Sequence, residues 1–234
     1  MIGRIQGASM RDAKELIEKK IRTAMPFAVY LCVYMICFEL IEGMGRRNYT
    51  VIEADIDRMI PFCEIFVVPY LLWFVYSFLL IVYILFVDEE SYHKICAWYV
   101  IGMSLFIAVS AVFPNIQFLR PMVMPRENLF TELVRLVYAS DTPTNVTPSI
   151  HVYNSLGMMT VIAHSETGIF RKKWVRVLME GFGVLIILST MLIKQHSALD
   201  VVAAMALGAA VTRVLYPVGA RIPGRLQLGA AVRR

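Results

Sequence analysis

The 234-residue sequence has few charged residues. Asp, Glu, Lys and Arg together make up 18% of the chain, whereas a typical soluble domain has about a quarter. Hydrophobic residues make up 58%, and the mean hydropathy is +0.63. This composition argues against a cytosolic globular protein and against an acidic disordered chain.

Cysteine is scarce as well, and the cysteines form neither a CxxC pair nor a metal-ligand spacing. We interpret them as buried small hydrophobic side chains, which excludes a disulfide-rich secreted module. The positions are Cys32, Cys37, Cys63 and Cys96. The N-terminal region also lacks the pattern of a secretory signal, because six basic residues precede the first apolar run and no small-residue cleavage site follows it.

What the sequence does contain is six apolar segments, each near the length of about 20 residues that a membrane-spanning helix needs. Their approximate ranges are 24–43, 62–87, 95–117, 147–164, 174–193 and 198–219. We therefore predict an all-α polytopic membrane protein in which residues 23–220 form a catalytic domain, a bundle of six transmembrane helices.

The two ends of the chain differ from this central domain. Within residues 1–22, Ala13, Leu16 and Ile17 fall on one helical face, opposite charged side chains. This pattern predicts an amphipathic helix that lies in the membrane interface. Residues 221–234 form a basic C-terminal tail.

The basic residues are distributed unequally between the two sides of the predicted membrane domain. Sixteen of the 23 lie in the N-terminal segment, in the loops after the second and fourth spans, and in the tail. By the positive-inside rule, both termini are predicted to be cytoplasmic. We interpret the net charge of +5 as membrane orientation and contact with anionic lipid headgroups, not as nucleic-acid binding.

This topology separates the four histidines. His93 and His164 fall on the cytoplasmic side, and His151 and His196 fall on the outer side. Asp200 follows His196 by four residues, so its carboxylate can accept a hydrogen bond from the imidazole and leave the other ring nitrogen free as a nucleophile. An ionisable residue inside a span is costly and usually functional. The alternative is a polar pair that only starts a helix.

Two further features on the outer side suggest an anion site. Pro148 and Ser149 come directly before the helical run that contains His151, so free backbone N–H groups are expected there. Arg120 closes the third span on the same side. A guanidinium binds phosphate oxygens bidentately, although a lone arginine is also a common interfacial anchor.

The order of these motifs is Arg120-Pro121, then Pro148-Ser149-Ile150-His151, then His196 followed by Asp200. This order resembles the type 2 phosphatidic acid phosphatase superfamily, which includes membrane lipid phosphate phosphatases and inositol phosphorylceramide synthases. The resemblance implies a six-helix membrane fold with the active site at the outer interface. The Pro-Ser-Ile-His form is more similar to the phosphotransferase-like branch.

Carried to this sequence, the resemblance implies that His196 attacks phosphorus and becomes a phosphohistidine. Asp200 would orient His196, and His151 would protonate the leaving oxygen. Arg120 and the Ser149 hydroxyl would hold phosphate oxygens. The resemblance implies neither a metal ion nor a cofactor.

Two cations of the family pattern are missing. Phe113 stands where a lysine is common, and Thr190 stands where an arginine is common. Because phosphoryl charge needs compensation, we expect Lys194, Arg126 or Arg135 to substitute. Lys194 is nearest in sequence to the nucleophile and is the first choice.

Between the motifs, residues 128–138 carry an apolar stripe and predict a short amphipathic helix, either beside the site or as a cover on the bundle. Residues 141–145 read as a turn-rich loop. Within it, Asn145 is a candidate contact to phosphate or to a headgroup.

We predict a membrane phosphatase that acts on a lipid phosphate through a phosphohistidine at the extracytoplasmic face. Its partners would be its lipid phosphate substrate and membrane lipids, with no nucleic acid. The alternative is a lipid phosphotransferase that uses the same residues, with an alcohol in place of water. A transporter or membrane scaffold would need essential polar residues at mid-membrane depth, whereas here they cluster at one interface.

Overall fold

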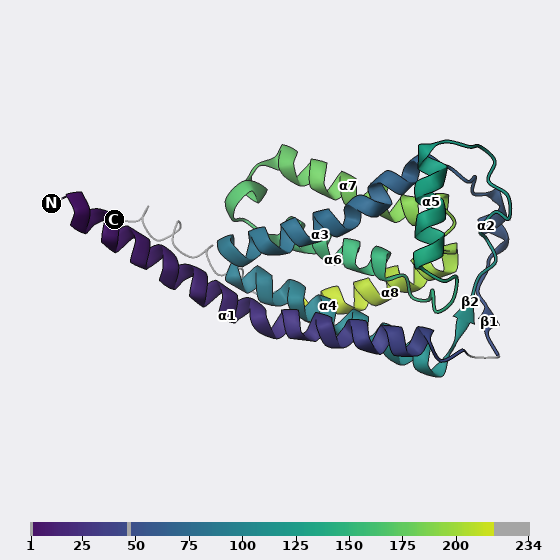
Figure 1. The fold of residues 1–234 in the computed structure, drawn as a ribbon, viewed down its shortest axis with the longest axis horizontal. Helices are drawn as coiled ribbons and strands as arrows, with labels where there is room; N and C mark the ends of the chain where they lie inside the picture. The colour runs from purple at the N-terminus through teal and green to yellow at the C-terminus, as the bar shows by residue number, and fades with distance from the viewer. Residues whose placement is uncertain (1, 46–47, 218–234) are drawn as a thin grey trace, which may run out of the picture.

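The computed structural model describes residues 2–45 and 48–217, with side chains from residue 10 onward. The described chain is mostly helical with very little sheet, as predicted (Figure 1). Its α-helices are α1 (Ile2–Glu42), α2 (Asp55–Met59), α3 (Val67–Val87), α4 (Glu89–Val112), α5 (Leu129–Ser140), α6 (Ile150–His164), α7 (Lys173–Leu192) and α8 (Ala198–Leu215). Two 3-10 helices, η1 (Glu64–Phe66) and η2 (Gly168–Arg171), and two short strands, β1 (Thr50–Val51) and β2 (Asn115–Ile116), complete the described elements.

Five helices of the described chain are long and apolar enough to cross a membrane: residues Met10–Glu42 of α1, Glu64–Val87 with α3, and α4, α7 and α8. The predicted count of six is therefore not confirmed. The predicted span 147–164 forms α6, which has 15 residues. At that length α6 is about 22 Å long, shorter than a hydrocarbon core of about 30 Å.

The short helix α6 is the centre of the bundle and packs against α3, α4, α7 and α8 (Figure 1). Tyr153 of α6 and Trp98 of α4 stack at 5.0 Å, and each donates a side-chain hydrogen bond to the backbone oxygen of the other. A Cβ on Gly157 would lie 2.4 Å from the Trp98 indole nitrogen, so glycine permits this close approach. Because α6 is enclosed by other helices, it need not match the thickness of the lipid.

α1 joins two segments that the sequence predicts separately. Residues 2–42 form one continuous helix, and the predicted interfacial helix over 1–22 is not confirmed. Pro26 lies inside α1, where it removes one backbone hydrogen bond without ending the helix. Lys20 is buried and pairs with Glu89 of α4 at 3.0 Å, so this part of α1 is held against the bundle.

The loops gather at two opposite ends of the bundle, in the grouping that the sequence predicts (Figure 1). One end is far from His151 and His196, and we call it the opposite end. There the Asp88 carboxylate accepts hydrogen bonds from the hydroxyl groups of Ser165 and Thr167. Which end faces the cytoplasm stays a prediction, and the basic tail 221–234 lies outside the described residues.

The other end, here called the site end, contains α2, α5, the strands and the turn between α7 and α8 (Figure 1). The predicted amphipathic helix 128–138 is confirmed as α5, which Asn128 and Thr131 cap reciprocally. Val134 and Val137 bury its apolar face against Val67 and other residues near the start of α3. The parallel pairing of β1 with β2, two residues long, has no signal in the sequence.

Candidate active site

His196 lies at the site end, in the turn between α7 and α8. The backbone N–H groups of Gln195 and His196 both donate to the Thr190 carbonyl, at 2.9 and 3.1 Å, and so hold the turn on the end of α7. Nδ1 of His196 lies 3.4 Å from Oδ2 of Asp200. Because α8 begins at Ala198, the pair meets across the helix start, not along a helical face as the spacing suggests.

Asp200 is completely buried and serves two structures at once. Its Oδ2 accepts the backbone N–H of Ser197 at 2.9 Å, which caps α8, and its Oδ1 accepts the hydroxyl of Thr147. The backbone oxygen of Asp200 accepts the N–H of Ser149 at 3.4 Å. The two motifs that carry the histidines are therefore bonded directly to each other.

His151 lies in the first turn of α6, which Ser149 caps by accepting the N–H of Val152 at 3.3 Å. The His151 ring packs against Tyr70 and Trp73 of α3, each at a centroid distance of 4.5 Å. Its centroid lies 6.0 Å from that of His196. Nε2 of His151 is buried and has no hydrogen-bond partner among the described residues.

Arg120 follows β2 and is held at one edge of its guanidinium. Nη1 donates to the backbone oxygens of Tyr138 and Asp141, and the guanidinium stacks on the Tyr138 ring at 4.5 Å. Nε and Nη2 are buried and have no partner within the part of the chain that the structure describes. These two nitrogens form the fork that binds two oxygens of one phosphate. Burial lowers the pKa of Arg120, and the Asp141 carboxylate acts in the opposite direction.

A family model, the PAP2 superfamily, matches residues 100–222, which is more than half of the chain. The chain belongs to the PAP2 superfamily. Membership indicates phosphatase or phosphotransferase activity on phosphate esters. No curated protein and no solved structure matched the chain.

The PAP2 match contains the five residues that the structure places together: Arg120, Ser149, His151, His196 and Asp200. It leaves out α1, α2 and α3. The aromatic residues of α3 that contact His151 therefore lie outside the part of the chain that shows the family.

Lys194, the first choice for replacing a missing PAP2 cation, has different partners from those expected. The Lys194 residue is buried, and its ammonium group donates to the backbone oxygens of Asp57, at 2.7 Å, and Ile60. Lys194 also has a positive φ of 57°, which turns the chain out of α7. The ammonium therefore ties the α7–α8 turn to α2, and the expected phosphate contact of Lys194 stays a prediction.

The other two predicted replacements are also engaged. Arg126 forms a bidentate ion pair with Glu64, with nitrogen–oxygen distances of 2.6 and 2.7 Å. Arg135 pairs with Glu127 and Glu132. Neither guanidinium is directed to the histidines by these contacts.

Sequence reasoning missed Asp57, a buried carboxylate of α2 that holds the α7–α8 turn next to His196. It accepts the Ser197 hydroxyl at 2.6 Å and the Ala198 N–H at 2.7 Å, so it caps α8 from outside. It also accepts the N–H of Ala54 at the start of its own helix. The pattern around Asp57 indicates only its local cap, because Ser197 and Ala198 lie about 140 positions away.

Asn145, the candidate phosphate contact of the 141–145 loop, instead donates its amide to Glu42 at the end of α1. Glu42 also accepts the hydroxyl groups of Thr142 and Thr144. α1 therefore fixes the loop that leads to Thr147 and Ser149.

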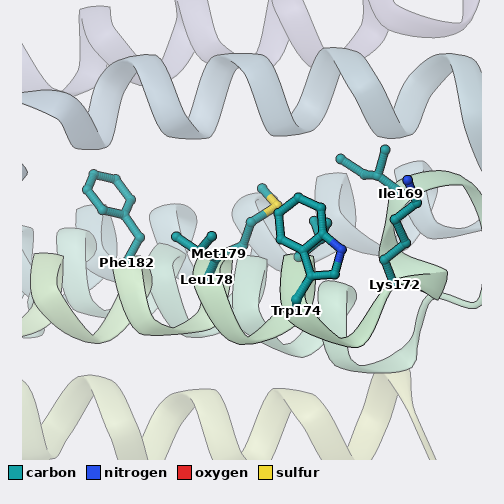
Figure 2. A pocket seen from close by; sticks show the side chains of 7 residues that line it. Ile169, Lys172, Trp174, Leu178, Met179 and Phe182 are labelled. Atoms are coloured by element: carbon teal, nitrogen blue, oxygen red, sulfur yellow. The ribbon is translucent and has the colours of Figure 1, made fainter.

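The described part of the opposite end contains neither His151 and His196 nor their neighbours Asp200 and Arg120. His164 lies there against Tyr216, and a pocket of about 480 Å³ runs along the start of α7. Figure 2 shows Trp174, Met179 and Phe182 lining it, with Lys172 at its edge. Within residues 2–45 and 48–217, no group of three or more His, Cys, Asp or Glu side chains is placed to hold a metal ion.

Proposed function

We propose that this PAP2 protein is a membrane enzyme that cleaves the phosphate ester of a lipid through a phosphohistidine on His196. The observation that carries the proposal is the meeting of two histidines with different surroundings. His196 contacts Asp200, the centroid of the His151 ring lies 6.0 Å from that of His196, and one edge of Arg120 at the same end is unpaired among the described residues.

In the first half of the reaction, the lone pair of His196 Nε2 attacks phosphorus and forms a P–N bond. Nδ1–H stays directed to Asp200, which fixes the tautomer and stabilises the positive charge that develops on the ring. The P–O bond to the lipid breaks, and its electron pair leaves with the lipid oxygen. That oxygen takes a proton from His151.

The free edge of Arg120 and the hydroxyl of Ser149 bind the equatorial phosphate oxygens. Because Ser149 is the N-cap of α6, the free N–H groups of the first turn of this helix would favour an anion beside the Ser149 hydroxyl. These groups are fixed by packing before substrate binds, so they stabilise charge in the transition state without reorganisation.

In the second half, the oxygen of an acceptor attacks phosphorus and gives its proton to His151, and the P–N electron pair returns to His196. With water as acceptor the reaction is hydrolysis, and with an alcohol it is transfer to a new ester. The proposed residues serve both outcomes, and hydrolysis is our first proposal.

The proposal is tested by trapping the intermediate. Purified protein is incubated with a ³²P-labelled lipid phosphate and quenched, and acid-labile, alkali-stable label is expected on the wild type. The label should be absent from His196→Ala and present in His164→Ala, a histidine variant at the opposite end. Label on His196→Ala, or none on a wild type that is turning over, would contradict the phosphohistidine. Turnover should persist with a chelator, because His, Asp and Arg carry the proposed chemistry.

We also propose that the site end faces the extracytoplasmic side, with both termini in the cytoplasm. The support is the excess of basic residues in the segments of the other side. In a variant without native cysteines, Met122→Cys should react with an impermeant thiol reagent on intact cells, whereas Glu166→Cys should not. The reverse pattern would overturn the orientation.

A further inference from the structure

The site contains a carboxyl group that the proposed mechanism does not use. Asp141 ends α5, and its Oδ2 accepts a hydrogen bond from Nε2 of Gln195 at 3.3 Å. Gln195 directly precedes His196 and is itself buried. Nη1 of Arg120 donates to the backbone oxygen of Asp141 at 2.9 Å. Asp141 is therefore held between the phosphate-binding arginine and the turn of the nucleophile.

The groups that face Asp141 come from four elements. Burial raises the pKa of Asp141, while His196 from the α7–α8 turn and Arg120 from the segment after β2 lower it. Glu42 at the end of α1 raises it further. Tyr70 of α3, which shares Gln195 as a partner, is neutral. Asp141 thus has one cation, Arg120, among these neighbours.

Compensating cations are few at this site. Lys194, Arg126 and Arg135 are bound elsewhere, and Arg58 is exposed on α2. A phosphate bound at the free edge of Arg120 would therefore meet one guanidinium and also the Asp141 carboxylate.

Lipid phosphate monoesters and diesters differ in the negative charge of the phosphate, and the Asp141 carboxylate repels negative charge. A phosphate monoester carries about −1.5 to −2 at pH 7, whereas a diester has only one ionised oxygen. Resting on the proposed function, we infer that Asp141 makes this site select the singly charged phosphate diester of a phospholipid over the monoester. The donor is then a phospholipid that carries an alcohol headgroup.

The proposed steps apply unchanged to a diester. His196 forms the P–N bond, the P–O bond to diacylglycerol breaks, and diacylglycerol leaves with the electron pair and the proton of His151. The headgroup stays on phosphorus. Water then releases a phosphorylated headgroup, and an acceptor alcohol instead yields a new diester, with the acceptor proton returning to His151 in both cases.

The test compares two substrates that share the leaving group. Purified protein is assayed on phosphatidic acid, the monoester, and on phosphatidylmethanol, the diester, and diacylglycerol release gives kcat/KM for each. Wild type should prefer phosphatidylmethanol. Asp141→Asn, which keeps an oxygen for Gln195, should shift the ratio toward phosphatidic acid by about tenfold or more, the order expected for one charge in a partly buried site.

The controls separate charge from folding. Asp141→Glu keeps the charge and should keep the wild-type ratio, and so should Asp55→Asn, which removes an exposed carboxylate from α2. In wild type, lowering the pH neutralises Asp141 and should raise the relative rate on phosphatidic acid. This rise should start at higher pH than for an ordinary carboxyl, because the pKa of Asp141 is raised. In Asp141→Asn only the protonation of the substrate itself should remain.

The outcomes distinguish this inference from the proposed function. If His196→Ala is inactive on both lipids but wild type prefers phosphatidic acid, or Asp141→Asn leaves the ratio within about twofold, charge selection is wrong and the mechanism stands. If His196→Ala stays active, the mechanism is wrong. In that case charge selection is tested by binding: the dissociation constants of the two lipids are measured by competition, and a preference for phosphatidylmethanol is expected. The same binding measurement is used if neither lipid is consumed.

Discussion

The two histidines of the site have opposite surroundings although their rings lie 6.0 Å apart. His196 is bound through polar groups: the Asp200 carboxylate at its ring and the Thr190 carbonyl at its backbone N–H. His151 is bound through aromatic rings, with Tyr70 and Trp73 each at 4.5 Å. In the proposed mechanism the nucleophile needs a fixed tautomer, and the Asp200 carboxylate would fix that of His196. A proton donor needs an unpaired nitrogen near the leaving oxygen, and His151 Nε2 is unpaired among the described residues.

The contrast also separates what belongs to the family pattern from what does not. Asp200 lies within the PAP2 match, four residues from His196, whereas the rings against His151 belong to α3, outside the match. His196, the proposed nucleophile, is therefore supported by a residue close in sequence, and His151, the proposed proton donor, is supported by a distant helix.

The proposed difference between the two histidines is tested by replacing each one in turn, and this should give the largest effect. His196→Ala should abolish turnover of a lipid phosphate and of an activated aryl phosphate, because every turnover needs the nucleophile. His151→Ala should lose the lipid reaction but retain more of the aryl reaction, since an aryl oxide leaves with little protonation. Rates on both substrates are measured side by side. Equal losses for both variants on both substrates would remove the assignment of roles.

The next largest effect is expected for Asp200→Asn. An amide cannot fix the imidazole as the carboxylate does, so kcat should fall by roughly a hundredfold to ten-thousandfold. Thr147→Val removes another partner of the same carboxylate and should cost less. Unfolding temperatures of both variants serve as the control, because Asp200 also caps α8. A small kcat effect in a folded Asp200→Asn protein would argue against the orienting role.

Asp57→Asn should have an intermediate effect, because Asp57 positions the turn that carries His196 without touching substrate. We expect kcat to fall by about tenfold with KM nearly unchanged. Asp57→Glu should recover part of the rate, and Asp55→Asn in the same helix should match wild type. If KM changes and kcat does not, Asp57 affects substrate binding instead of the nucleophile.

The smallest catalytic effect is expected for Lys194→Met. Its ammonium donates to the carbonyls of Asp57 and Ile60, so its loss should lower the melting temperature and leave KM within about twofold of wild type. Burial lowers the pKa of Lys194, in keeping with its structural place. A rise in KM of about tenfold would return Lys194 to the phosphate site.

Several helices were predictable because each contains a long apolar run in the sequence. Both ends of α7 lie within one residue of the predicted limits of 174–193, and α3 ends at the predicted residue 87 but begins at Val67, five residues after the predicted start of 62. The predicted limit of 117 for the third span was late, because α4 ends at Val112 and the chain turns into β2. A long apolar run predicts that a helix forms. The residue at which the helix ends depends on packing, which the run does not reveal.

The charge partners were predicted less well than the motifs. Lys194, Arg126 and Arg135 look alike as free cations in the sequence, yet each is bound by a different group. Asp141 reads as part of a turn and lies instead beside Gln195. The residues in these contacts are between 8 and 137 positions apart in the sequence. Local periodicity does not reveal partners at the larger separations.

The amino-acid sequence was sufficient to predict an apolar helical chain, two groups of loops, and motifs that place two histidines, an aspartate and an arginine at one end. It was sufficient because hydrophobic length, charge asymmetry and short spacings act locally. Three features became evident only from the packing of the whole chain: α6 is a short enclosed helix, α1 is continuous, and the Lys194 ammonium binds carbonyls near α2 while Asp141 lies beside Gln195. Those outcomes depend on which side chains can satisfy buried charges across the bundle, and that choice is made only when distant segments pack together.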